Sequence, residues 1–118
     1  MFNSPITTKI RITPPSLIVY VLKRNKQVAK INCVIFNDTN SISIGDIQCE
    51  KNNKGYGSLM MQSLISYAKE NNFSYIYGWL AKIDSDHTDR LYHFYEKFGF
   101  EITPNDDGNK YADIKLTI

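Results

Sequence analysis

The sequence predicts an α+β fold, in which a mixed, mostly antiparallel sheet is packed against helices. Apolar and polar residues alternate with period two through the first half of the chain, as in strands, whereas two later stretches repeat their apolar residues every three or four positions, as in amphipathic helices. One strand lies between the two helical stretches, and a strand–helix–strand crossover joins parallel neighbours. The sheet should therefore contain at least one parallel pair.

Three strands are predicted before the first helix, over residues 17–22, 28–36 and 41–49. The first is a β-branched and aromatic run that follows Pro14-Pro15, and we expect it to be buried. A short polar turn separates the first two strands, which makes these two antiparallel neighbours. Gly45 interrupts the third strand and indicates either a β-bulge or a glycine that the strand merely tolerates.

The second half of the chain alternates helices and strands. The predicted elements are a helix with an apolar stripe at Tyr56, Leu59, Met60, Leu64, Tyr67 and Ala68, a strand over residues 73–80, a helix with Leu91, Phe94, Tyr95 and Phe98 on one face, and strands over residues 100–103 and 111–118. Gly99 is expected to end the second helix in the left-handed conformation. A turn cluster at residues 104–109 separates the last two strands.

Length and composition indicate one compact domain, residues 1–118. The chain is 42% hydrophobic and 22% charged, which is ordinary for a globular protein. Its net charge of +2 is too small to favour nucleic acid as a partner, although it is compatible with a small anionic ligand. Two cysteines are too few for a disulfide scaffold, so we expect free thiols.

No segment predicts secretion or insertion into a membrane. The longest apolar run, residues 17–22, is much shorter than the roughly 20 residues of a spanning helix. Asn3, Ser4 and Pro5 interrupt the N-terminus where a secretory signal would be apolar. We therefore expect a soluble, cytoplasmic protein without a membrane partner.

A segment with two glycines, residues 50–58, joins the third predicted strand to the first helix. Free N–H groups and the helix dipole at such a junction favour phosphate binding, and Gly55 and Gly57 would let a phosphate approach the backbone. Lys51 and Lys54 add positive charge. A tight turn without a ligand remains the alternative, because the segment has neither the Lys-Ser/Thr ending of a P-loop nor the third glycine of a dinucleotide fingerprint.

Residues 91–100 supply a second motif, with Tyr95 and a Gly-Phe pair at its end. Together with residues 52–57 it resembles the GNAT superfamily of acetyl-coenzyme A-dependent N-acetyltransferases, whose members have Arg/Gln-x-x-Gly-x-Gly/Ala at this strand-to-helix junction and, later, Asn-x-x-Ala-x-x-Leu/Phe-Tyr-x-x-x-Gly-Phe. The resemblance runs over residues 41–100. It implies a GNAT-like fold, acetyl-coenzyme A as co-substrate, and direct attack of a primary amine on the thioester in a ternary complex.

The resemblance also implies which residues bind the coenzyme: Ile47, Gln48, Cys49, Asn52, Asn53, Lys54, Gly55, Tyr56, Gly57, Ser58, Thr88 and Tyr95. Residues 52–58 would hold the pyrophosphate, and residues 47–49 would present backbone groups to the pantetheine arm and the acetyl carbonyl. The chain departs from the family pattern at three positions. Asn52 replaces Arg or Gln, Thr88 replaces Asn, and Leu91 replaces Ala.

Tyr95 matches the family tyrosine that commonly acts as general acid, and a phenol can give the departing thiolate its proton. The attacking amine must lose a proton, so a general base is also expected. Glu50 is one candidate, with Asp46, Glu101 or a chain of waters as alternatives. Ser41 stands near the position of a glutamate base in the branch that acetylates protein lysines, and a serine cannot replace a carboxylate.

Other reactive residues fit less well into this chemistry. His87 and His93 do not share a helix face, so no metal site is expected. Cys49 has no neighbouring histidine to activate it and is expected to be a small packing residue. Tyr75, Tyr77 and Trp79 share one strand face, where they either line the acceptor pocket or pack in the core.

The identity of the acceptor stays open. In fuller family members, helices early in the chain help to form the acceptor pocket, and here little helical sequence precedes the third predicted strand. The acceptor is therefore a small molecule or a protein or peptide amine at an open site, or the site is completed in a homodimer. The alternative is a catalytically weak or inactive module that binds coenzyme A or a partner protein, and a more distant one is a small nucleic-acid binder.

Overall fold

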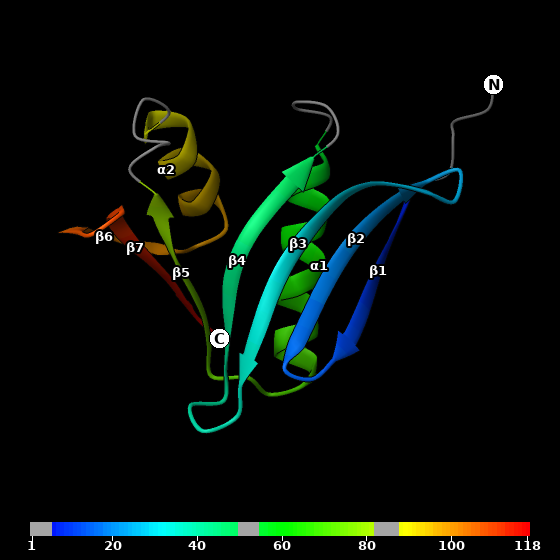
Figure 1. The fold of residues 1–118 in the computed structure, drawn as a ribbon, viewed down its shortest axis with the longest axis horizontal. Coiled ribbons are helices and arrows are strands. Elements are labelled where there is room, and N and C mark those ends of the chain that lie inside the picture. The colour runs from blue at the N-terminus through cyan, green and yellow to red at the C-terminus, as the bar shows by residue number, and fades with distance from the viewer. Residues whose placement is uncertain (1–5, 50–54, 82–87) are drawn as a thin grey trace.

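The computed structural model describes residues 6–49, 55–81 and 88–118, which form a seven-stranded sheet and two helices (Figure 1). The elements in chain order are β1 (Ile6–Thr13), β2 (Ser16–Lys23), β3 (Lys26–Phe36), β4 (Ser41–Cys49), α1 (Tyr56–Glu70), β5 (Tyr75–Ala81), α2 (Thr88–Lys97), β6 (Glu101–Asp107) and β7 (Lys110–Thr117). The sheet order is β1-β2-β3-β4-β5-β7-β6. Only β4 and β5 pair in parallel among these strands, which confirms the predicted mixed, mostly antiparallel α+β fold.

β1 is the element that we did not predict from the sequence. It pairs with β2 from Ile6 opposite Lys23 to Thr13 opposite Ser16, so the Pro14-Pro15 turn joins two antiparallel strands. β1 is the edge of the sheet, and nearly all of its residues are exposed. A weak alternation of isoleucine with threonine and basic residues was its only signal.

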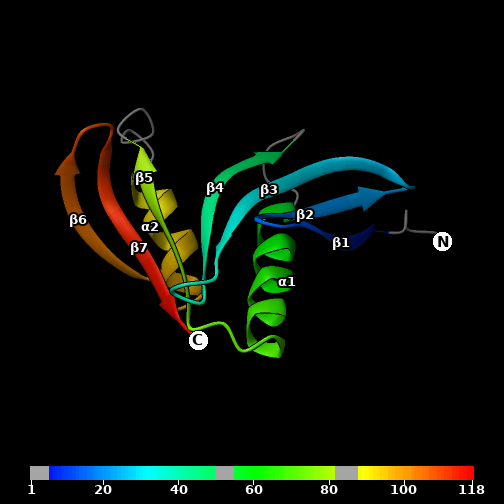
Figure 2. The ribbon, with the colours of Figure 1, turned by 60° about the horizontal axis from the view of Figure 1, so that its bottom comes forward.

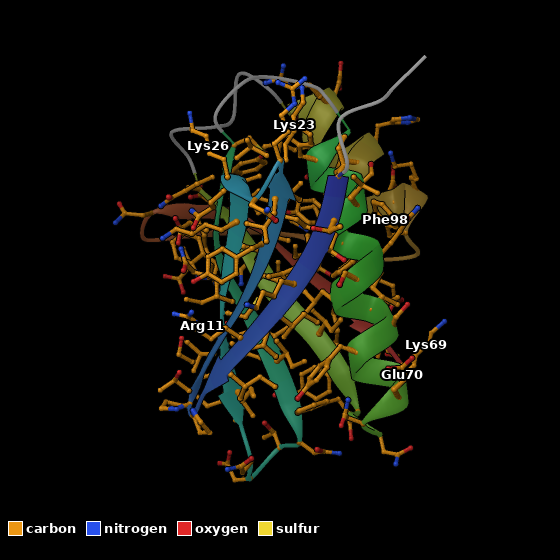
Figure 3. All side chains as sticks on the ribbon, turned by 90° about the vertical axis from the view of Figure 1, so that its right-hand side faces the viewer. Arg11, Lys23, Lys26, Lys69, Glu70 and Phe98 are labelled. Carbon is orange, nitrogen blue, oxygen red and sulfur yellow. The ribbon has the colours of Figure 1, made fainter. Side chains whose placement is uncertain are left out.

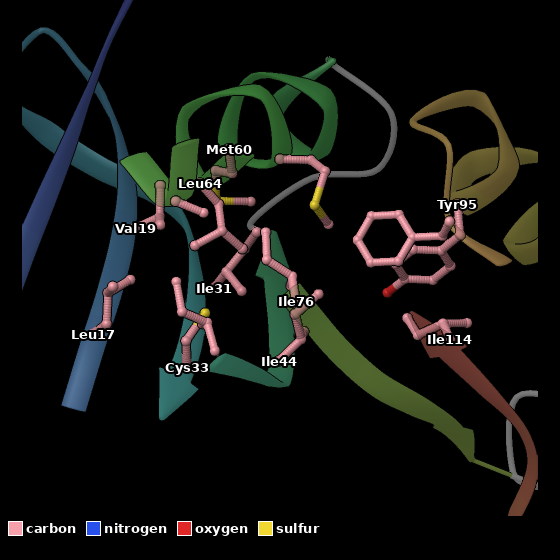
Figure 4. Close-up of a cluster of buried hydrophobic side chains, with 14 of the residues drawn as sticks. Leu17, Val19, Ile31, Cys33, Ile44, Met60, Leu64, Ile76, Tyr95 and Ile114 are labelled. Carbon is pink, nitrogen blue, oxygen red and sulfur yellow. The ribbon is translucent and has the colours of Figure 1, made fainter. Parts of the chain in front are cut away.

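Both helices pack on the same face of the sheet (Figures 2 and 4). This explains why β2 is only half buried, contrary to our expectation. Leu17, Val19 and Val21 are fully buried on the face that α1 covers, whereas the alternate residues Ile18 and Tyr20 remain partly exposed on the other face. Burying each large apolar side chain contributes about 1.5–3 kcal/mol to stability, so this one face supplies most of the core energy.

The opposite face of the sheet is covered by neither helix. Figure 3 shows α1 on one side of the sheet and Arg11 on the other. Cross-strand partners place large side chains on this helix-free face, among them Val34, Phe36 and Trp79, which are 38, 40 and 52% exposed.

β4 and β5 separate along their length. They pair only from Ser41 opposite Tyr75 to Ser43 opposite Tyr77, and then diverge (Figure 1). The β3–β4 register shifts so that Gly45 has no partner, which confirms a β-bulge at this glycine. A Cβ atom on Gly45 would lie 2.9 Å from the Asn32 carbonyl oxygen, so the bulge also needs the close backbone approach that glycine allows.

The other predicted elements are present, and some of them differ from the prediction in their ends or in which residues they bury. Gly99 has φ +93°, as expected for a left-handed helix end. The α1 stripe is buried except for Tyr67, which is partly buried, and Leu59, which is exposed; Met61, which we did not assign to the stripe, is fully buried. β6 continues through Pro104 to Asp107, so the last turn is shorter than predicted.

Candidate active site

A cavity of about 400 Å³ occupies the gap where β4 and β5 separate. Residues from both strands, from α2 and from β7 line it: Ile44, Gly45, Asp46, Ile47, Gly78, Trp79, Leu80, Ala81, Arg90, Leu91, Tyr95 and Ile114. Isoleucine, leucine and glycine form most of the wall, and Asp46, Arg90 and Tyr95 are its side chains with acid–base groups. An apolar cleft with a few polar groups is typical of a small-molecule site.

Tyr95 enters this cavity from α2. Its ring makes edge contacts with Phe94 and Phe100, at centroid distances of 5.1 and 5.4 Å, and the residue is only 6% exposed. Figure 4 shows the hydroxyl directed toward the part of the sheet that holds Ile44 and Ile76. The aromatic packing therefore fixes a phenol group at the separation of β4 and β5.

Asp46 follows the Gly45 bulge and lines the same cavity. Its carboxylate accepts hydrogen bonds from Asn32 Nδ2 at 3.0 Å and from Gln48 Nε2 at 2.6 Å. Burial and the negative charge of Asp46 raise the pKa of the Cys33 thiol to about 12. The amide partners hold Asp46 in place at the rim as a hydrogen-bond acceptor.

The first turn of α1 is the described part of the predicted phosphate segment. Gly55 is the N-cap, with φ 76°, and it has no side chain with which to cap the helix. A Cβ atom on Gly57 would lie 3.4 Å from the Phe94 ring, so this glycine also lets α2 pack closely. Lys97 Nζ, at the end of α2, donates a hydrogen bond to Ser58 Oγ at 3.0 Å.

The predicted coenzyme-binding residues that the structure describes lie in the cavity, at the end of β4 and at the beginnings of the two helices. Ile47 and Tyr95 line the cavity, Gln48 and Cys49 lie at the exposed end of β4, and residues 55–58 begin α1. Thr88 is the first residue of α2. The predicted residues Glu50, Asn52, Asn53 and Lys54, with Lys51, lie outside the described residues.

The structure places two of the candidate general bases, Asp46 and Glu101, and the three aromatic residues of β5, whereas Glu50 lies outside the described residues and stays a prediction. Asp46 lines the cavity, whereas Glu101 stands opposite Lys115 on the β6–β7 hairpin. Of the three aromatic residues on β5, Trp79 lines the cavity, and Tyr75 and Tyr77 pack against each other at a centroid distance of 5.6 Å.

Two residues near the site were not predicted from the sequence. Arg90 lines the cavity, and Lys97 contacts the first turn of α1. Both are ordinary exposed charges on a short helix, and only the packing of α2 against α1 and the sheet shows where they point.

Cys49 is exposed, not packed as we expected. Partial desolvation by neighbouring atoms still raises the pKa of its thiol above the ordinary value, which opposes formation of a nucleophilic thiolate. Among residues 6–49, 55–81 and 88–118, no three His, Cys, Asp or Glu side chains gather as metal ligands. In the same residues, no helix has the length and apolarity needed to cross a membrane.

Sequence comparison finds a family and a relative. Residues 4–100 match the model of the acetyltransferase (GNAT) family. The uncharacterized protein YocC of Bacillus subtilis is 42% identical to the chain over 67 residues, which are 57% of this chain and 40% of YocC. The chain thus aligns with less than half of that relative.

Solved structures of acetyltransferases share the fold. The ribosomal-protein-S18-alanine N-acetyltransferase of Escherichia coli matches with a TM-score of 0.73 and 15% identity over 91% of this chain and 72% of its own. The PaiA N-acetyltransferase of Thermoplasma acidophilum, solved with coenzyme A, matches with a TM-score of 0.71 and 15% identity over 88% of this chain and 62% of its own. A putative streptothricin acetyltransferase of Bacillus anthracis, solved with acetyl coenzyme A, matches with a TM-score of 0.67 and 22% identity over 90% of this chain and 64% of its own. The family match covers residues 4–100, and the shared fold agrees with it. The chain therefore belongs to the GNAT family of acetyltransferases.

Proposed function

We propose that this protein is an N-acetyltransferase that moves an acetyl group from acetyl-coenzyme A to a primary amine. One observation carries the proposal: in a chain of the GNAT family, a buried tyrosine enters a cavity between two strands that separate beside a helix N-terminus. A proton donor and an anion-binding helix end are the two features that thioester aminolysis with a phosphate-bearing donor requires.

The described residues fit coenzyme A as a ligand. The first turn of α1 presents N–H groups without a capping side chain and contains no acidic residue, so it favours a phosphate. The cavity beside Ile47 and Tyr95 has room for a narrow, mostly apolar arm. When bound there, acetyl-coenzyme A would supply the activated acetyl thioester.

The side chains of the cavity would perform the proton transfers. Asp46, held by two amide donors, accepts a proton from the incoming ammonium group, directly or through water. Backbone N–H groups at the free edge of β4 hold the carbonyl oxygen as the amine attacks. Tyr95 then donates its proton to the departing thiolate, and no covalent enzyme intermediate is needed.

The helix-free face favours an extended acceptor such as a peptide or protein amine. Trp79 is the most exposed of the large hydrophobic residues, at 52%, and it lines both the main cavity and a neighbouring one of about 200 Å³. Exposed tryptophans beside a cleft are frequent anchors of protein ligands. A small amine would find little to enclose it on this open side, whereas a polypeptide can contact Trp79 and reach the cavity with one amine.

Substitution of Tyr95 tests the proposed reaction. Tyr95→Phe removes only the hydroxyl, so we expect the rate of thiol release from acetyl-coenzyme A with a panel of peptide and small amines to fall at least about tenfold. Tyr92→Phe is the matched control, because Tyr92 lies on the same helix and stacks on Tyr111 outside the cavity.

The same assay distinguishes an enzyme from a binding module. Calorimetry should show that wild type and Tyr95→Phe bind acetyl-coenzyme A with similar affinity. Equal turnover by wild type and Tyr95→Phe would show that Tyr95 is not the general acid. Binding without turnover by the wild-type protein across the whole panel would favour the inactive module.

A further inference from the structure

A second, smaller cavity lies on the other side of Trp79 from the main cavity between β4 and β5. This side cavity has a volume of about 200 Å³ and is lined by Trp79, Asp107, Asn109 and Lys110. Sites for whole small molecules typically measure about 300–1,000 Å³, so the side cavity suits a single long side chain. Its wall combines one aromatic ring with three polar or charged residues, which indicates a charged occupant.

The ring of Trp79 is open to such an occupant. The residue is 52% exposed, and within residues 6–49, 55–81 and 88–118 it forms no ring contact or cation–π contact. Tyr75 lies on the same face of β5, and Lys115 Nζ is 4.4 Å from the centroid of its ring. Tyr75 is thus already covered by an ammonium group of the protein, whereas the indole of Trp79, which attracts cations more strongly than a phenol does, is not.

The charges around the side cavity favour a cation. Asp107 is exposed, and among the residues that the structure describes its carboxylate has no hydrogen bond or ion pair. Lys110 Nζ is paired with Asp113 Oδ1 at 3.0 Å, and Asn105 Nδ2 donates a hydrogen bond to Asp113 Oδ2 at 2.6 Å. The hydrogen bonds from Asn105 and Lys110 lower the pKa of Asp113, so this carboxylate stays ionised and neutralises Lys110. The carboxylate of Asp107 therefore determines which charge the side cavity prefers.

Trp79 also connects the side cavity to the proposed site of acetyl transfer. It lines the main cavity together with Asp46 and Tyr95. Arg90 lines the main cavity and not the side cavity, so its charge does not oppose a cation beside Asp107. One extended acceptor can thus place its amine in the main cavity and a second group in the side cavity.

We propose that the side cavity binds a basic side chain of a peptide acceptor and selects peptides with arginine or lysine within about three residues of the acetylated amine. This inference rests on the proposed function and names the class of acceptor. The guanidinium or ammonium group would stack on the indole of Trp79 and donate hydrogen bonds to the carboxylate of Asp107.

Peptides that differ by one charge test the inference. Each has a single free amine, either the N-terminus or one lysine behind a blocked N-terminus, and carries arginine or neutral citrulline at each nearby position in turn. Arginine has no amine to be acetylated, so turnover reports on one site. We expect kcat/KM of the wild-type protein to be at least about tenfold higher for the best arginine peptide than for its citrulline counterpart, mainly through KM.

Variants of Asp107 assign this preference to the side cavity. Asp107→Asn keeps the size and removes the charge, so kcat/KM for the arginine peptide should fall at least about tenfold, while that for the citrulline peptide stays within about twofold. Asp106→Asn is the matched control, because it makes the same change at the next residue, which lines neither cavity. Asp107→Lys should shift the preference to a glutamate peptide, a gain that loss of folding cannot produce.

Trp79 is the one tryptophan of the chain, so its fluorescence reports binding in the side cavity without any turnover. The arginine peptide should change the emission of the wild-type protein at concentrations at least about tenfold lower than the citrulline peptide does. Asp107→Asn should remove this difference between the two peptides, and Asp106→Asn should keep it.

Each outcome has a defined meaning. If arginine and citrulline peptides are bound and acetylated equally, the inference is wrong and the proposed function stands. If Asp107→Asn lowers the values for both peptides equally, Asp107 only supports its hairpin and the inference is also wrong. Faster acetylation of a small polyamine than of every peptide would overturn the peptide class. If no amine is acetylated but the arginine peptide binds selectively beside Trp79, the proposed reaction fails while the side cavity is supported as a site for basic peptides.

Discussion

Burial and neighbouring charge determine the chemistry of single side chains around the cavity. Cys33 and Asp46 lie on adjacent strands, and the structure gives them opposite properties. Asp46 is an exposed carboxylate held by Asn32 and Gln48, whereas Cys33 is a buried thiol that resists ionisation. The Cys33 thiol therefore stays protonated near neutral pH and cannot act as a base there.

The Cys33 thiol should make the protein less stable in alkali. Its pKa rises from 9.0 in the unfolded chain to about 12 in the folded protein, so the folded state holds the proton more tightly. This contribution to stability is complete below pH 9 and is lost as the pH rises toward 12, at up to about 1.4 kcal/mol per pH unit.

Urea unfolding at a series of alkaline pH values measures this effect. The free energy of unfolding of wild type should fall more steeply above pH 9 than that of Cys33→Ala, which has no thiol to ionise. Parallel curves for the two proteins would contradict the burial of Cys33. Exposed Cys49 should also react with a thiol reagent well before Cys33 does.

At the scale of elements, the active-site cavity depends on how β4 leaves β5. The bulge at Gly45 bends β4 just beyond its last pair with β5, while β5 remains paired with β7 along its whole length. The cavity is therefore a product of backbone geometry, and one glycine is central to it.

Gly45→Ala should damage this geometry. The new Cβ atom would lie 2.9 Å from the carbonyl oxygen of Asn32, so the backbone must shift, and we expect the free energy of unfolding to fall by about 1–3 kcal/mol. Gly57→Ala is the contrasting variant, because its Cβ atom would meet only the Phe94 ring at 3.4 Å and alanine favours the helix.

Urea denaturation of both variants gives the comparison. Gly57→Ala should stay within about 1 kcal/mol of wild type. Acetyl transfer should fall in Gly45→Ala as the cavity changes shape. A Gly45→Ala protein as stable and as active as wild type would show that the bulge does not determine the shape of the cavity.

The elements that a local pattern determines were predictable, and those that depend on their neighbours were not. The apolar spacing from Tyr56 to Ala68 is sufficient to predict α1, because a helix buries one stripe whatever lies beneath it. β1 was missed because it is an exposed edge strand that packs only Ile10 against the core and so needs few apolar residues. β2 is half exposed because both helices pack on the same face of the sheet, and no local pattern in β2 predicts that arrangement.

Some features of the candidate site were likewise predictable from local motifs, and others depend on the fold. The sequence singled out Tyr95, which lines the cavity, and the glycines at residues 55 and 57, which begin α1, because they belong to motifs with fixed spacing. That Asp46 lines the cavity and Glu101 does not could not be predicted, since it depends on the sheet topology. Lys97 required the packing of two helices that are far apart in the sequence.

At the scale of the whole molecule, the arrangement separates the two substrates. The coenzyme would lie on the helix side, between the first turn of α1 and Tyr95, and the acceptor would approach from the helix-free face, where Trp79 is exposed. The two meet only at the gap between β4 and β5. This geometry suits direct transfer, because both substrates can be bound at once.

A crystal structure of the protein with acetyl-coenzyme A tests this arrangement most directly. The proposed mechanism predicts an acetyl group in the gap between β4 and β5, a thioester sulfur within about 3.5 Å of the Tyr95 hydroxyl, and phosphates at the first turn of α1. Coenzyme bound elsewhere, or an acetyl group that Tyr95 cannot reach, would contradict it.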